Sequence, residues 1–123
     1  MLNRQQFFGK KSESKAAKFL KKQGYKILEQ NYRSKLGEID IIAKDKSTLV
    51  FVEVKARRSR QFGNPKWAIT PKKKRKISMV ALLYLKSTRQ IGVKARFDVV
   101  SIDSTNEDRE IELIRNAFEL TYE

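Results

Sequence analysis

Hydrophobic and polar residues alternate along two neighbouring stretches near the middle of the chain. Residues Leu49–Lys55 carry Leu, Phe, Glu and Lys on one face of a strand and three valines on the other. Residues Glu38–Ala43 carry Glu, Asp and Ile on one face and Ile, Ile and Ala on the other. The polar residues 44–47 between them suit a short turn. The pattern predicts an antiparallel hairpin with an apolar face, which another element must cover.

The predicted register gathers carboxylates at one end of this hairpin. Pairing of Ala43 with Thr48 would place Glu38 opposite Glu53. It would also make Asp40 and Glu53 diagonal neighbours, ~7–8 Å apart at the backbone. Opposed carboxylates repel each other, and a divalent cation would remove that cost; hard oxygen ligands suit Mg²⁺ or Mn²⁺. We therefore expect a metal site here, against the alternative of a solvent-facing charged end on an ordinary amphipathic hairpin.

The chain before the hairpin predicts a helix over residues 3–23, which Gly24 ends. Glu13 lies on the apolar stripe of this helix, together with Ala16 and Leu20. A carboxylate there is either solvated at the margin of the stripe or directed into a shared site. Residue statistics alone favour the solvated position.

Four further elements complete the pattern. Residues 25–28 predict a short strand before the hairpin. Thr70-Pro71 is typical of a helix start, and this helix is expected to run to about Ser87. Its buried stripe would consist of Ile77, Val80, Ala81 and Tyr84. Residues 93–103 predict another strand, and residues 109–118 a weak, acidic edge strand.

Composition narrows the chemistry that this chain can perform. With 123 residues, 40% of them hydrophobic, residues 1–123 are expected to form a single domain, whose last ~15 residues are a weakly defined acidic edge segment. The absence of cysteine excludes disulfides, thiolate zinc sites and cysteine nucleophiles. The absence of histidine excludes Ser-His-Asp catalysis, histidine-based ribonuclease chemistry and histidine metal sites. An enzyme with this sequence must use carboxylates, lysine, tyrosine and a metal ion.

The charge of the chain is strongly positive and unevenly distributed. The formal net charge is +14, but seven of the 14 acidic residues and only two of the 28 basic ones lie from Asp103 onward, which leaves +19 on residues 1–102. Such a field favours polyanions. Residues 55–76 hold ten Lys or Arg and no acid, with Phe62 and Trp67 between them, a pattern typical of nucleic-acid contact. Trp67 taken alone is better explained as a core anchor.

Basic residues crowd the predicted start of the second helix, where positive charge opposes the helix dipole unless a phosphate binds. Lys73 lies one turn before Ile77 and is placed to point toward the acidic end of the hairpin. We expect nucleic-acid contacts from Arg33, Arg57, Arg58, Lys72, Lys73 and Lys76. No apolar run approaches the roughly 18 residues of a membrane span, and no signal peptide is evident, so we expect a cytoplasmic protein without a membrane partner.

The order of elements, with Asp40 and Glu53-Val54-Lys55 in the central hairpin, resembles the core of the PD-(D/E)xK, or restriction-endonuclease-like, superfamily. More closely, the chain resembles the YraN family (UPF0102) of small bacterial proteins. The matching stretches run nearly end to end: Gly9 with Glu13 and Ala16, Asn31-Tyr32-Arg33, Gly37-Glu38-Ile39-Asp40, Val50–Arg57, Phe62-Gly63, Ala68-Ile69-Thr70 with Lys73, Arg96-Phe97-Asp98-Val99, and Asn116-Ala117-Phe118. The chain departs from these patterns at Ile39, where the superfamily has proline, at Ser12, where a second glycine is common, and at Tyr32, where tryptophan is common. None of these departures removes a charged group.

The resemblance implies an α/β fold with an αβββαβ core, in which helices flank a central mixed sheet. It implies that Asp40 and Glu53 bind Mg²⁺ (or Mn²⁺) and that Lys55 is the catalytic lysine. It also gives Glu13 and Glu38 places at the site, which reverses the solvated interpretation of Glu13.

The function implied is that of an Mg²⁺-dependent endonuclease that hydrolyses phosphodiester bonds of DNA, with branched or junction DNA and a homodimer suggested by analogy. The alternative is a non-catalytic basic module that binds DNA or structured RNA on the same fold. A further alternative is a ribosome- or RNA-associated protein, whose affinity for structured RNA would not depend on magnesium.

Overall fold

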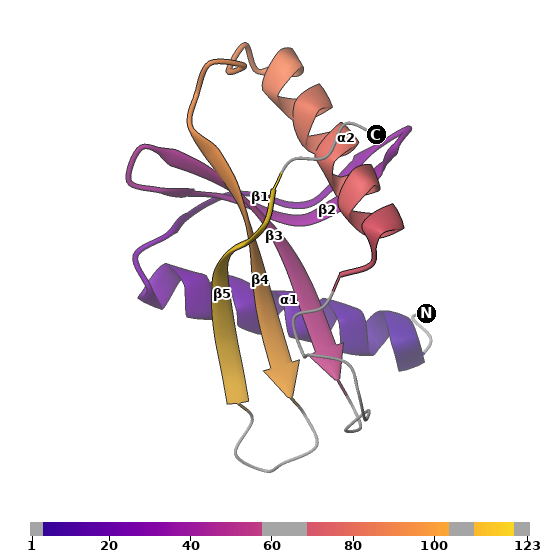
Figure 1. Ribbon diagram of the computed structural model, residues 1–123. Coiled ribbons are helices and arrows are strands. Elements are labelled where there is room, and N and C mark those ends of the chain that lie inside the picture. Colours follow the sequence, from indigo (N-terminus) through magenta and orange to yellow (C-terminus); the bar gives the residue numbers. More distant parts are fainter. Residues whose placement is uncertain (1–3, 58–68, 104–109, 120–123) are drawn as a thin grey trace.

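Five strands form one mixed sheet with a helix on each face (Figure 1). The computed structural model describes residues 4–57, 69–103 and 110–119, and for residues 4–11, 57 and 110 it describes the backbone alone. The elements follow the order α1 (Arg4–Lys22), β1 (Lys26–Ser34), β2 (Gly37–Asp45), β3 (Thr48–Arg57), α2 (Pro71–Ser87), β4 (Ala95–Asp103) and β5 (Glu110–Phe118). The αβββαβ core predicted from the sequence is confirmed, with β5 as an additional strand.

The strands lie side by side in the order β1-β2-β3-β4-β5. The pair β3 and β4 is parallel, while the other neighbouring pairs are antiparallel. Parallel neighbours require a crossover connection, and α2 lies between these two strands in the chain. The expected edge strand at the end of the chain is confirmed, because β5 borders the sheet beside β4.

One face of the sheet is covered by α1. Its apolar stripe, including Ala16 and Leu20, is buried against the β2 and β3 residues Ile41 and Val52. The helix ends at Lys22, one residue before the predicted end, and Gly24 follows with a φ of 96° in the left-handed region that glycine adopts without strain. The periodicity of the stripe thus predicted the face that α1 buries, and the glycine predicted its end to within one residue.

The other face is covered by α2, in the place and over the length predicted. Thr70 is the N-cap, and its Oγ1 accepts a hydrogen bond of 3.2 Å from the backbone N–H of Lys73. Pro71 occupies the first turn, where its missing N–H costs nothing. The predicted stripe of Ile77, Val80, Ala81 and Tyr84 is buried in the core on this face, together with Phe51 and Phe97.

The register of the central hairpin differs from the predicted one by two residues. Ala43 pairs with Val50 rather than with Thr48, and Thr48 pairs with Asp45. The connection is therefore a two-residue turn that begins at Lys46, which adopts a left-handed φ of 56°. A shift of two residues keeps each side chain on its face, so the apolar pattern could not distinguish the two registers.

The predicted apolar face of β2 is interrupted at Ile39. Ile41 and Ala43 face α1 as expected, but Ile39 packs in the core beneath α2. The paired residues of β2 and β3 run from Asp45–Thr48 only as far as Ile41–Val52, although both strands continue. Once β2 is no longer held in this ladder it turns away, and the strict alternation of its side chains is lost.

Within the described ranges, neither helix is long and apolar enough to cross a membrane.

Candidate active site

The site lies in the gap that opens where β2 and β3 stop pairing. Asp40 is the first β2 residue beyond the last pair, and its Oδ2 accepts a hydrogen bond of 2.8 Å from the backbone N–H of Val54. The carboxylate thus takes the place of a strand partner for β3. This bond holds Asp40 between the two strands, where groups from both faces of the sheet can reach it.

Glu53 approaches the gap from the α2 face, because it follows Phe51 by two positions along β3. Its side chain is only 8% exposed, and Lys73 Nζ lies 2.7 Å from its Oε1. Burial and then the negative charge of Asp40 raise the pKa of Glu53 from 4.5 to about 7, although the bond to Lys73 acts in the opposite direction. The sequence-based expectation that Lys73 points toward the acidic end of the hairpin is confirmed.

Glu13 reaches Asp40 from the opposite face, on α1. Its carboxyl hydrogen bonds with the side chains of Asp40 and Asn31. Burial, followed by the charge of Asp40, raises the pKa of Glu13 from 4.5 to about 7. The interpretation of Glu13 as a solvated residue at the margin of its stripe is therefore wrong, while the catalytic role that the resemblance gives it stays a prediction.

Asn31 also meets the carboxylates, through its hydrogen bond with Glu13, although its residue type alone did not indicate a place at the site. Its neighbours pair with Ile39 and Ile41, so Asn31 lies across from Asp40 in the ladder between β1 and β2. Its φ of 53° is left-handed, which is unusual in mid-strand. The available signal was weak: asparagine tolerates this conformation better than other non-glycine residues, but it also occurs in many ordinary turns.

Two further predicted residues flank the carboxylates. Lys55 is half-buried and follows Glu53 by two positions on β3, in register with Ser101 of β4. Glu38 is half-exposed and forms an ion pair of 3.4 Å with the exposed Arg33. The charge of Glu38 also contributes to raising the pKa of Glu13, which places it near the site. The predicted opposition of Glu38 and Glu53 is wrong, because the register is shifted by two residues.

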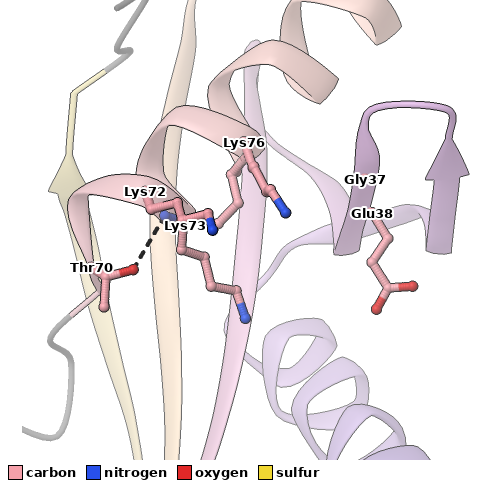
Figure 2. A pocket seen from close by; sticks show the side chains of 7 residues that line it. Gly37, Glu38, Thr70, Lys72, Lys73 and Lys76 are labelled. Carbon is pink, nitrogen blue, oxygen red and sulfur yellow. Dashed lines mark hydrogen bonds between the residues drawn. The ribbon is translucent and has the colours of Figure 1, made fainter.

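A cavity of about 390 Å³ adjoins the carboxylates between the start of α2 and the start of β2. It is lined by Gly37, Glu38, Thr70, Lys72, Lys73, Lys76 and Ile77. Figure 2 shows Lys72, Lys73 and Lys76 on the first turns of α2, with the strand that carries Glu38 beside them. Burial lowers the pKa of Lys73, but its bond to Glu53 and the charges of Glu53 and Asp40 outweigh this and raise it, so its amine is cationic.

Of the residues predicted to bind nucleic acid, the structure brings together Lys72, Lys73 and Lys76 at this cavity. Arg33 lies nearby through its pair with Glu38. The side chain of Arg57 and the whole of Arg58 lie outside the described residues, as do Phe62 and Trp67. The expectations for these four residues stay predictions.

The donor set suits a hard divalent cation only in part. In the described segments, no group of three or more carboxylates is arranged to hold a metal ion. Asp40 and Glu53 nevertheless offer oxygen ligands in one gap, where burial and the charge of Asp40 raise the cost of ionising Glu53. Mg²⁺ is commonly bound by one or two carboxylates that are completed by water and substrate phosphate, rather than by an all-protein cage. Two carboxylates beside a cationic cavity fit Mg²⁺ or Mn²⁺ in that mode.

Comparisons with known proteins point to one family. The model of "Uncharacterised protein family UPF0102" matches residues 12–102. A UPF0102 protein of Desulfosudis oleivorans is 56% identical over 119 residues, which cover 97% of this chain and 95% of that protein. A UPF0102 protein of Syntrophus aciditrophicus is 53% identical over 114 residues, covering 93% and 90%. A third, from Geobacter metallireducens, is 51% identical over 114 residues, covering 93% of each chain.

Proposed function

This chain belongs to the uncharacterised protein family UPF0102, and we propose that it is a metal-dependent nuclease that hydrolyses phosphodiester bonds of DNA. The observation that carries the proposal is the meeting of Asp40, Glu53 and Glu13 in the gap between β2 and β3, next to a cavity lined by lysines. The αβββαβ order of the elements, which is that of restriction-endonuclease-like cores, supports the same reaction class.

Binding of a polyanion alone gives no reason for this cluster. Burial, followed by the charge of Asp40, raises the pKa values of Glu13 and Glu53, so gathering these three carboxylates is costly. They would also repel phosphate. A protein whose residues 1–102 carry a charge of +19 would bind nucleic acid better without them. The cluster becomes useful if a divalent cation neutralises it and couples it to the phosphate.

Each residue has a chemical task in such a reaction. Asp40 and Glu53 would hold Mg²⁺ or Mn²⁺, which when bound polarises the scissile phosphate and acidifies a bound water. Asp40 is oriented for this by the N–H of Val54. Lys55 would place positive charge beside the phosphate as negative charge develops in the transition state. Glu13 shares a hydrogen bond with Asp40 and would keep that carboxylate directed into the gap.

A non-catalytic nucleic-acid-binding module is the second candidate. It is favoured by the lack of a three-carboxylate metal group among the described residues and by the lysine that already neutralises Glu53. Such a module would use Lys72, Lys76 and the remaining basic surface for phosphate contacts. Its affinity for DNA or structured RNA would not respond to the carboxylates.

The test compares wild type with Asp40→Ala and Lys55→Ala on labelled duplex and four-way-junction DNA, with Mn²⁺ or Mg²⁺ present. We expect wild type to cleave at least one of these substrates and both variants to lose at least ~100-fold in rate while still binding DNA. Glu29→Ala, which alters an exposed carboxylate of β1, is the matched control and should cleave like wild type. Cleavage by Asp40→Ala at the wild-type rate would refute the nuclease. Tight binding without cleavage by wild type would favour the binding module.

A further inference from the structure

Lys73 is bonded to one of the two carboxylate oxygens that Glu53 could offer to a metal ion. Its Nζ lies 2.7 Å from Oε1 of Glu53, a carboxylate whose side chain is 8% exposed. The Lys73 side chain itself is 57% exposed. The Glu53 carboxylate of this ion pair is therefore buried in the protein, whereas the Lys73 side chain is largely exposed at the cavity.

An ammonium group and a divalent cation compete when both approach the same carboxylate oxygen. A hydrogen bond of 2.7 Å already uses that oxygen, and a Mg²⁺ ion placed at its usual ~2.1 Å would repel the adjacent ammonium strongly in a poorly solvated gap. The ion pair must therefore open before Glu53 binds a metal ion through Oε1. Without substrate, the ammonium group of Lys73 therefore serves as the counter-ion of Glu53 at the proposed metal site.

The cavity provides the place to which Lys73 moves. Lys73 lines it together with Lys72 and Lys76, and lysine has a flexible four-carbon stem that can swing its ammonium by several ångströms. The three ammonium groups outnumber Glu38, the carboxylate that lines the same cavity, so a further anion among them would reduce their mutual repulsion. A backbone phosphate of a nucleic acid has the charge and the acceptor oxygens to bind there.

We propose that Lys73 alternates between Glu53 and a phosphate of the substrate backbone, so that the divalent cation and the nucleic acid bind cooperatively. The inference rests on the proposed function, because it assumes that Glu53 binds a metal. Each ligand removes an obstacle for the other: phosphate draws Lys73 from Glu53, and the metal releases Lys73 to the phosphate. By linkage, DNA must then tighten metal binding by the same factor by which the metal tightens DNA binding.

The experiment measures Mn²⁺ affinity by calorimetry under argon, for wild type and Lys73→Met, with and without a short DNA duplex made of phosphorothioate linkages that resist cleavage. Low ionic strength ensures that the basic protein binds the duplex. Without Lys73 the pKa of Glu53 rises further, so the titrations are run at about pH 8.5 to keep the carboxylate ionised. Lys86→Met, at the other end of α2, is the control for loss of one positive charge, and Lys73→Arg retains the charge that pairs with Glu53.

We expect Lys73→Met to bind Mn²⁺ alone about tenfold more tightly than wild type, although it has lost a residue of the site. Lys86→Met and Lys73→Arg should resemble wild type. DNA should tighten Mn²⁺ binding about tenfold in wild type and little in Lys73→Met. Equal or weaker Mn²⁺ binding by Lys73→Met, with unchanged thermal stability, would overturn the inference.

The outcomes also separate this inference from the nuclease. If Asp40→Ala abolishes Mn²⁺ binding but Lys73→Met does not improve it, the metal site stands and the exchange of Lys73 is refuted. If Lys73→Met behaves as expected but no DNA is cleaved, the cooperative site stands and catalysis is refuted. If neither protein binds Mn²⁺ with or without DNA, both proposals fall.

Discussion

At the scale of single residues, the site is governed by carboxylates that are held closer together than their charges favour. Burial removes the water that would stabilise the ionised form of Glu53, and Asp40 adds a second negative charge in the same gap. The result is a pKa of about 7 for Glu53 and for Glu13, so neither is fully ionised at neutral pH. Lys73 relieves part of this repulsion for Glu53, and Asn31 does so for Glu13.

The raised pKa of Glu53 predicts a pH-dependent cost to folding. A carboxyl with a pKa of 4.5 in the unfolded chain and about 7 in the folded one destabilises the protein as pH rises through this interval. Glu53→Gln should equal wild type near pH 4.5 and be more stable above pH 7, by up to ~3 kcal/mol. Urea unfolding at both pH values measures this, with Glu29→Gln as the exposed control. A difference that does not change with pH would contradict the prediction.

The left-handed backbone at Asn31 predicts an unusual order of substitutions. Because φ is 53°, a Cβ is unfavourable there, and Asn31→Gly should be more stable than Asn31→Ala by ~1 kcal/mol. In an ordinary strand the order is reversed, so Gln30→Ala should be more stable than Gln30→Gly at the neighbouring position. Chemical denaturation of the four variants measures both differences. If the alanine variant were the more stable one at position 31 as well as at position 30, the backbone at Asn31 would not be strained.

At the scale of elements, two aspartates fill breaks in the sheet. Asp40 accepts the N–H of Val54 where β2 leaves β3, and Asp98 accepts the N–H of Asn116 at 2.9 Å where the pairing of β4 and β5 shifts. In each case a carboxylate satisfies a backbone group that the ladder leaves without a strand partner. The first break adjoins the candidate active site. The second connects β4 and β5 to the end of α1, because Tyr25 Oη also donates to Asp98, at 2.9 Å.

Asp98 is predicted to matter for stability rather than for chemistry. It is fully buried and accepts hydrogen bonds from three donor groups, one of which is Arg96 Nε at 3.1 Å from Oδ1 and 3.3 Å from Oδ2. Asp98→Asn would place an amide donor against donors and weaken the compensation of the Arg96 charge, which should cost about 3 kcal/mol. Asp45→Asn removes the charge of the less buried partner of Arg96 and should cost only about 1 kcal/mol. Urea unfolding measures both, and equal costs would contradict the assigned role of Asp98.

At the scale of the whole molecule, the sheet brings together groups that neither helix could assemble alone. Glu13 comes from α1 on one face, Glu53 and Lys73 meet on the α2 face, and Asp40 lies in the gap between the strands. Lys72, Lys73 and Lys76 lie at the cavity beside this acidic cluster, in a chain whose formal net charge is +14. Such a net charge favours attraction of polyanions at long range, and the proposed cation would offset the negative charge of the carboxylates at the site.

The sequence by itself determined the elements and the faces that they bury. The stripe of α2, its Thr70 cap and the alternation in β3 follow from local backbone geometry, so they could be predicted without knowing any partner. The same reasoning placed Lys73, because one helical turn before a buried residue must lie over the same face. The carboxylates Asp40 and Glu53 were found because acids interrupt an otherwise apolar strand pattern.

Only the tertiary structure decided which of these residues meet. Strand periodicity determines which face a side chain occupies but not which residue it pairs with. Because a shift of two residues leaves every side chain on its face, the predicted register of the hairpin was wrong by two residues. The position of Glu13 on the apolar stripe of α1 could not predict its contact with Asp40. That contact depends on the end of β2–β3 pairing next to Asp40. The left-handed backbone at Asn31 lies across from Asp40, beside the same gap between β2 and β3. These features depend on how strands and helices from distant parts of the chain pack together, which no local pattern encodes.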